Sequence, residues 1–182
     1  MRRHQEVVSR LCDSFGEVIS ELGQAWTDTL RSGNKILFCG NGGSAADSQH
    51  LATELVVRFR LDRRSVPGLA LTTDTSILTA AGNDYGFDSI FARQVSGLGQ
   101  PGDLLVGIST SGASPNVVKA VEVAREGGLK AMAFCGEKRG PVADQADFVF
   151  AAPSSETARI QECHLLVGHI LCDMVDEEFS GD

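Results

Sequence analysis

A chain of 182 residues with 42% hydrophobic content is long enough to bury a full core, and we expect one domain over residues 1–182. Its net charge of -8 argues against binding to nucleic acid or to an anionic membrane, because basic patches hold phosphate groups. No apolar leader is present, no apolar run approaches the roughly 18 residues of a membrane span, and the five cysteines form no C-x-x-C pair. We therefore expect a cytoplasmic protein with reduced cysteines.

The first predicted element is a long amphipathic helix over residues 4–31, whose apolar side chains recur at helical spacing. Gly16 and Gly23 fall within it and are the positions at which we expect it to bend. No strand precedes this helix, so its apolar face has no neighbouring sheet segment in the sequence to pack against. We therefore expect residues 1–32 to pack on the body of the domain or on another subunit, and residues 33–182 to form an α/β core.

The core is predicted to alternate strands with helices. Strands are expected at 35–39, 69–71, 104–108, 129–134 and 147–151. Helices are expected at 44–59, 75–81, 87–97, 115–126 and 157–179, with a turn at 82–86. The basic cluster 58–64 is interpreted as a solvated helix end. Strands separated by helices imply a five-stranded parallel sheet with right-handed crossovers and helices on both faces.

The segment from Gly40 to Glu54 combines an anion site with a pair of metal-ligand side chains. A buried strand leads into the glycine-rich turn Gly40–Ser44, and a helix N-terminus behind such a turn suits a phosphate. His50 and Glu54 share one face of the following helix, about 40° apart around its axis. The turn also fits the dinucleotide pattern G-x-G-x-x-A, but no acidic residue ends the second strand about 20 residues later, so we reject a nucleotide cofactor.

A second loop of small polar residues follows the third predicted strand. It carries four hydroxyl side chains, those of Ser109, Thr110, Ser111 and Ser114. The carboxyl ends of parallel strands meet at one edge of a sheet, so this loop and Gly40–Ser44 are expected to border one crevice. That pairing favours a phosphate site over a solvated loop that only caps a helix.

The last predicted helix carries Gln161 and His169, eight residues apart and about 80° apart around its axis. Together with His50 and Glu54 they would supply two nitrogen and two oxygen ligands, a set that Zn²⁺ or a similar ion accepts. Spacing does not bring two separate helices together, so the alternative remains that each histidine is a helix-face residue satisfied by a hydrogen bond. We assign His164 to that second class, because it lies about 140° from His169 around the helix.

These motifs together resemble the phosphoheptose isomerase family, a branch of the sugar isomerase (SIS) fold. The likeness runs in order along nearly the whole chain. It is carried by Gly40-Asn41-Gly42-Gly43-Ser44, His50-x-x-x-Glu54, the run from Gly82 to Asp88, Ser109-Thr110-Ser111-Gly112, Arg159-Ile160-Gln161-Glu162, and His169. The serine loop alone would indicate only an SIS domain that binds phosphosugars, and the ligand pairs narrow the resemblance. It implies a flavodoxin-like α/β/α sandwich and a homotetramer with active sites at subunit interfaces.

The resemblance also implies roles for individual residues. One Zn²⁺ per subunit would be held by His50, Glu54, Gln161 and His169. Substrate contacts would come from Asn41, Gly42, Gly43, Ser44, Glu54, Arg58, Asn83, Asp84, Ser109, Thr110, Ser111, Ser114 and Gln161. Two positions depart from the family's pattern: Ala113 replaces the usual Asn, and Ala158 stands where some members carry an acid. Neither position belongs to the ligand set.

The reaction implied by the resemblance is the isomerisation of sedoheptulose 7-phosphate to D-glycero-D-manno-heptose 7-phosphate, the first step of ADP-heptose and lipopolysaccharide biosynthesis. Aldose–ketose isomerisation through an enediolate needs a base at carbon and an acid at oxygen. We assign this work to Glu54 and His169, with Glu54 as the carbon base. The alternative is a non-catalytic SIS tetramer that binds the bacterial replication initiator. That branch lacks the counterparts of Glu54 and His169, whose presence favours the enzyme.

Overall fold

Five strands form one all-parallel sheet in the order β2-β1-β3-β4-β5. They are β1 (Ile36–Gly40), β2 (Gly68–Ala70), β3 (Leu104–Ile108), β4 (Lys130–Gly136) and β5 (Phe148–Ala152). The central strands β1 and β3 are buried along their whole length, as in sheets that helices cover on both faces. The computed structural model describes residues 1–181, and it confirms the predicted five-stranded parallel sheet.

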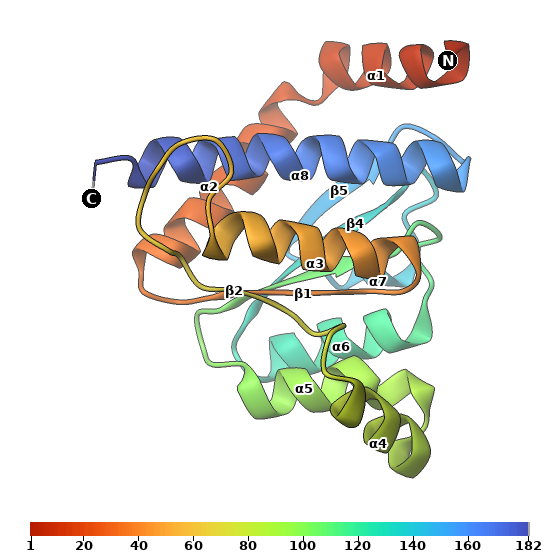
Figure 1. Cartoon of the computed structure of the whole chain (residues 1–182). Coiled ribbons are helices and arrows are strands. Elements are labelled where there is room, and N and C mark those ends of the chain that lie inside the picture. Colours follow the sequence, from red (N-terminus) through yellow and green to blue (C-terminus); the bar gives the residue numbers. More distant parts are fainter. Residues whose placement is uncertain (182) are drawn as a thin grey trace.

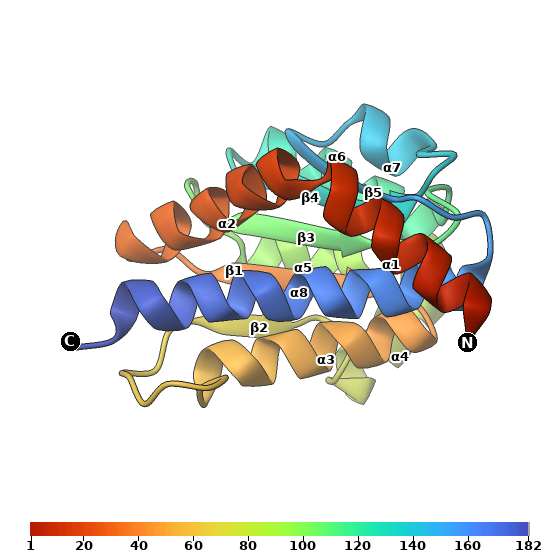
Figure 2. The same cartoon turned by 90° about the horizontal axis from the view of Figure 1, so that it is seen from above.

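Successive strand residues point to opposite faces, and each face has its own helical layer (Figures 1 and 2). Ile36 and Phe38 belong to one hydrophobic cluster, whereas Leu37 and Cys39 belong to the other. The first cluster is covered by α2 (Gly16–Arg31), α3 (Gly43–Val56) and α8 (Thr157–Phe179). The second is covered by α4 (Thr75–Tyr85), α5 (Ile90–Leu98), α6 (Pro115–Glu126) and the short α7 (Pro141–Asp144). This arrangement confirms the three-layer α/β/α sandwich.

The helix expected over residues 4–31 is two helices, α1 (Arg2–Ser14) and α2, separated at Phe15. The bend expected at Gly16 lies at this break. Gly23 has a different role from the one expected, because it lies inside α2, where a Cβ would come within 2.2 Å of the Met174 sulfur. Its lack of a side chain lets α2 pack closely on α8.

Helix α1 lies across the outer side of α8, away from the sheet (Figures 1 and 2). Nδ1 of His4 lies 2.7 Å from a carboxylate oxygen of Glu162, and Arg3 donates to Glu156 at 3.1 Å. In α1 only Leu11 is buried within the described chain. Packing of this segment on another subunit stays a prediction, as does the division into a helix of residues 1–32 and a core.

The predicted turn at 82–86 is wrong, because α4 continues through these residues to Tyr85 and ends at Gly86 (φ 83°). Asp74 caps the start of α4, and Gly82 packs beside Ile90 of the next helix, so tertiary packing outweighs the weak helix propensity of glycine. Asn83 and Asp84 therefore lie on the last helical turn of α4.

The segment between α3 and β2 also differs from the prediction. Helix α3 ends at Val56, three residues before the expected end, and residues 57–67 form a loop without helix or strand. The guanidinium of Arg63 is fully buried, so the interpretation of 58–64 as a solvated helix end is wrong for this residue. Within residues 1–181, no helix has the length and apolarity needed to cross a bilayer.

Candidate active site

The glycine loop lies at the carboxyl edge of the sheet, between the end of β1 and the start of α3. Gly42 has a φ of 56°, which glycine adopts without strain. The amides of Asn41 and Asn116 exchange two hydrogen bonds of 2.8 Å, and these tie the loop to the first turn of α6. The glycine loop and the serine loop that precedes α6 therefore lie together, as the sequence predicted.

Hydroxyl groups gather around Ser109 in the serine loop. Its Oγ lies 2.8 Å from that of Ser114 and 3.4 Å from that of Ser111. Ser114 occupies the N-cap position of α6, so the hydroxyls stand beside the positive end of a 12-residue helix. A cavity of about 220 Å³ opens next to them, lined in part by Thr110, Ser111, Lys138, Ser154 and Thr157. These features suit the oxygens of a phosphate.

Helices α3 and α8 lie side by side on one face of the sheet (Figures 1 and 2). A Cβ on Gly168 would come within 2.6 Å of a Leu51 methyl group, so the glycine permits a close approach of the two helices. His169 and His50 are the chain neighbours of these two residues. Close packing of α8 on α3 therefore brings the two imidazoles together.

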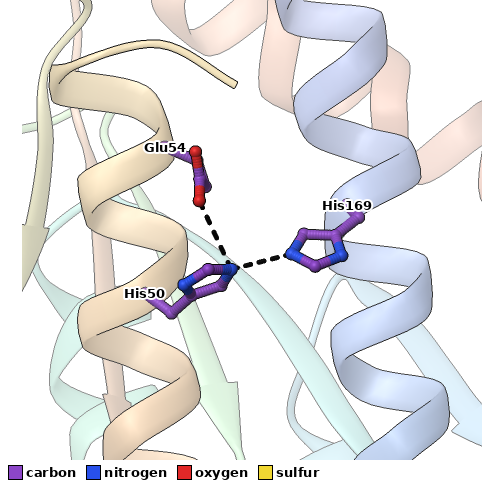
Figure 3. A group of neighbouring side chains, drawn as sticks. All are labelled: His50, Glu54 and His169. Atoms are coloured by element: carbon purple, nitrogen blue, oxygen red, sulfur yellow. Dashed lines mark hydrogen bonds and ion pairs between the residues drawn. The ribbon is translucent and has the colours of Figure 1, made fainter. Parts of the chain in front are cut away.

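Three side chains converge between these helices (Figure 3). Nε2 of His50 lies 2.7 Å from Nε2 of His169 and 3.3 Å from a carboxylate oxygen of Glu54. One nitrogen or oxygen of each residue lies within 4.8 Å of the others. The side chain of Glu54 is 16% exposed, whereas that of His50 is 43% exposed. The group is thus open to solvent on the side of His50.

Burial lowers the pKa of His169 from its ordinary value, and the nearby His50 lowers it further. The carboxylates of Glu54 and Asp173 oppose this shift of the pKa. A lowered pKa keeps the imidazole neutral near pH 7, and the neutral ring is the form that binds a metal.

Gln161, the fourth predicted ligand, lies on the first turns of α8, and its amide packs against the N-terminal turn of α3. Its amide nitrogen is 3.4 Å from the carboxylate of Asp47, three residues before His50. A Cβ on Gly43 would come within 2.3 Å of the same nitrogen, so Gln161 occupies space that only glycine leaves free. Burial raises the pKa of Asp47, while the bond from Gln161 and the nearby His50 oppose that rise.

The converging residues have the right chemistry for zinc. Two imidazole nitrogens and a carboxylate oxygen are ligands that Zn²⁺ takes. Gln161 is bonded to Asp47 outside this group of three, and its role as a fourth ligand stays a prediction. Ligand atoms of a tetrahedral zinc ion are about 3.3 Å apart. The distance between Glu54 and His50 matches this value, and the imidazoles at 2.7 Å need only a small outward rotation. The residues therefore fit the ion.

The other predicted substrate residues lie apart from this group. Asn83 and Asp84 are exposed on α4, which covers the opposite face of the sheet from α3 and α8 (Figure 1). Arg58 is exposed in the 57–67 loop, where it donates to the carbonyl of Arg60 at 3.3 Å. A single chain therefore does not gather all the residues that the sequence assigned to the site.

An apolar cavity of about 510 Å³ lies between the glycine loop and α4. It is lined in part by Asn41, Gly42, Leu78, Phe87 and Phe91. Sequence reasoning missed its apolar residues, since ordinary helix-face leucine and phenylalanine carry no signal of a site. It also missed Asp47, although a carboxylate three residues before His50 on a helix lies on the same side and could have been considered.

Comparison with known proteins places the chain in a family. A family model described as the SIS domain matches residues 1–136. The curated phosphoheptose isomerase of Akkermansia muciniphila is 55% identical over 163 residues, which are 90% of this chain and 86% of that protein. The chain belongs to the phosphoheptose isomerase family. This membership confirms the resemblance predicted from the sequence and makes the chain an enzyme of the phosphosugar isomerase class.

Solved structures of family members have the same fold. The phosphoheptose isomerase of Neisseria gonorrhoeae matches with a TM-score of 0.91 and 42% identity, covering 97% of this chain and 94% of that one. The phosphoheptose isomerase of Francisella tularensis matches with a TM-score of 0.93 and 36% identity over the same shares of both chains. The SIS fold is therefore confirmed over nearly the whole chain.

Proposed function

We propose that this member of the phosphoheptose isomerase family converts sedoheptulose 7-phosphate to D-glycero-D-manno-heptose 7-phosphate, the first step towards ADP-heptose and lipopolysaccharide. The observation that carries the proposal is the convergence of His50, Glu54 and His169 from two helices. The names of the family members support the heptose phosphate as substrate. The branch that binds the replication initiator lacks the counterparts of Glu54 and His169, and the presence of both residues here argues against that alternative.

Glu54 and His169 are proposed to move the protons of the reaction. Glu54 removes a proton from C1, the electrons of that bond form the C1=C2 double bond of an enediolate, and His169 protonates O2. Return of the proton from Glu54 to C2, with loss of the O1 proton to His169, completes the aldose. The position of His169 supports this role, because one of its ring nitrogens lies within 4.8 Å of a carboxylate oxygen of Glu54.

We assign one Zn²⁺ per subunit to this site, held by His50, Glu54, Gln161 and His169. The ion, when bound, would act as a Lewis acid that stabilises negative charge on the substrate oxygens. Asp47 accepts a hydrogen bond from the Gln161 amide nitrogen, so the amide oxygen is the atom that we assign as metal ligand.

The phosphate of the substrate is assigned to Ser109, Thr110, Ser111 and Ser114, with the backbone of the glycine loop alongside. Hydroxyl groups at a helix N-terminus hold the far end of the sugar. Fixing that end converts binding energy into orientation of C1 and C2. The absence of bulky side chains in this loop leaves room for the phosphate oxygens.

A homotetramer with active sites at subunit interfaces is part of the proposal. It is supported by the position of Asn83 and Asp84, which are exposed on the layer opposite to the converging histidines. A second subunit would supply such residues to the site. The net charge of -8 argues against nucleic acid or an anionic membrane as a partner, and we propose a cytoplasmic location.

The substrate assignment is tested by incubating the purified zinc-loaded protein with sedoheptulose 7-phosphate and following aldose formation by chromatography. Unphosphorylated sedoheptulose and fructose 6-phosphate are the matched controls for the phosphate and the chain length. We expect turnover of the heptulose phosphate and much slower turnover of both controls. No turnover, combined with binding to the replication initiator, would support the non-catalytic alternative instead.

A further inference from the structure

A fully buried ion pair joins the 57–67 loop to α8. Nε of Arg63 lies 2.8 Å from a carboxylate oxygen of Asp176, and both side chains are 0% exposed. The same carboxylate accepts backbone N–H bonds from Arg60 at 2.5 Å and Leu61 at 2.7 Å. A buried carboxylate with several donors holds its partners in one geometry. Asp176 therefore fixes the path of this loop over α8, which Figure 1 shows in yellow beside the blue helix.

The guanidinium of Arg63 also closes the end of α3. It donates to the backbone carbonyl of Glu54 at 2.8 Å and to that of Leu55 at 2.9 Å. These carbonyls belong to the last turn of α3, where helical partners are missing and a cation is favourable. The ion pair thus holds the helical turn that carries the candidate base and ligand Glu54.

The loop fixed in this way presses an aromatic ring on the second histidine. The rings of Phe59 and His169 are stacked, with centroids 5.0 Å apart and planes 20° apart. Phe59 is half-buried, so its ring is held between the loop and α8. Stacking restricts rotation of the His169 ring, whose Nε2 faces His50.

We propose that Arg63 and Asp176 are positioning residues for the candidate metal site, acting through Phe59 on His169 and through the α3 backbone on Glu54. The proposal rests on the proposed function, because it takes these two residues as metal ligands. Partners of metal ligands set ligand orientation, and losing one costs 10- to 100-fold in metal affinity. A pair that only fastened the loop to the body would change the stability of the fold and leave the affinity of the folded protein unchanged.

The chain offers a matched control in a second ion pair between the same loop and the same helix. Nη1 of Arg60 lies 2.8 Å from the carboxylate of Asp173, with side chains 67% and 35% exposed. Replacing Arg60 by alanine removes this surface pair and keeps the backbone bond of residue 60 to Asp176. The control therefore alters charge and contacts near the site without touching the buried pair.

The test compares D176N, F59L and R60A with the wild type. The affinity for zinc alone is measured by competition with a chromophoric chelator on protein whose circular dichroism is native. We expect affinity to fall at least 10-fold in D176N and F59L and to stay within twofold in R60A. Histidine-ring NMR signals of the metal-free proteins supply a second measurement, in which we expect the His169 signals to shift in D176N and F59L and not in R60A.

Wild-type zinc affinity in both D176N and F59L would overturn the positioning role. If D176N does not fold, F59L alone decides, because leucine keeps an apolar side chain at this half-buried position on the margin of the core. If the wild type binds no zinc, the metal assignment fails on its own. The ring signals then decide, and unchanged His169 signals in F59L would overturn the positioning role independently.

Discussion

The Nε2 atoms of His50 and His169 lie 2.7 Å apart, although 119 residues separate them in the chain. Two uncharged imidazoles make such a contact only when the N–H of one ring donates a hydrogen bond to the unprotonated nitrogen of the other. The same two nitrogens, with the Glu54 carboxylate beside them, are the groups that we propose as metal ligands. Packing of α8 on α3 at Gly168 is what creates this group.

Replacing Glu54 or His169 by glutamine is expected to abolish turnover and to leave a folded protein. Each change removes a proton-transfer group and approximately keeps the size of the side chain. We expect kcat to fall by at least about 1,000-fold, because the variant loses acid–base catalysis and a metal ligand at once. Steady-state kinetics with circular dichroism checks this. The control E178Q makes the same type of change on the surface of α8, and near-normal kcat in E54Q or H169Q would contradict the assigned roles.

Substitution of Gly112 by alanine is expected to damage the phosphate site. Gly112 has a φ of 69°, and a Cβ there would come within 1.5 Å of the Arg139 carbonyl oxygen. The left-handed backbone alone costs about 1–2 kcal/mol for alanine, and the clash must displace the serine loop. We expect KM for the phosphorylated substrate to rise at least 10-fold. G97A is the control, since nothing lies near that position, and its KM should be unchanged.

The fold was largely predictable because its boundaries carry strong local signals. Ser114 and Pro115 mark the start of α6, whose bounds and those of α8 are as predicted. The end of α4 was not predictable, because Gly82 and Asn83 are typical of a turn and become helical only through packing against the next helices. Local propensity and tertiary contact disagree there, and the contact prevails.

The site was predictable in part. Helical periodicity placed His50 beside Glu54 on one face, but it said nothing of where α8 lies relative to α3. Burial of Arg63 was not predictable, since its neighbours are charged and its partner Asp176 lies 113 residues away. Pairing across such a distance is set by the packing of the whole domain.

His164 is expected to make stability depend on pH between 6.5 and 4. Burial lowers the pKa of this imidazole from 6.5 to about 4, although its bond to the Cys135 carbonyl opposes the shift. The unfolded chain then binds the proton more tightly than the folded chain does. The contribution of His164 to the free energy of unfolding is therefore full above pH 6.5, and it falls by about 3 kcal/mol in total as the pH drops to about 4. Urea denaturation of metal-free wild type and H164L measures the difference, and parallel pH dependence of the two would contradict the assignment.

Breaking the buried pair is expected to cost far more stability than breaking the surface pair of the same loop. D176N leaves the buried Arg63 cation without its counter-charge, and such a change costs about 3–5 kcal/mol. D173N removes only the exposed partner of Arg60, at a cost of less than about 1 kcal/mol. Urea midpoints of the two variants provide the comparison, and equal midpoints would show that burial of Arg63 does not matter for stability.

The central claim is that His50, Glu54, Gln161 and His169 form a zinc-dependent catalytic site. The most direct measurement is the rate of sedoheptulose 7-phosphate isomerisation by protein stripped with a chelator, verified as zinc-free by elemental analysis, and then titrated with zinc. We predict that activity is lost on stripping and returns with one equivalent of zinc per subunit. Full activity in the zinc-free protein would contradict the claim.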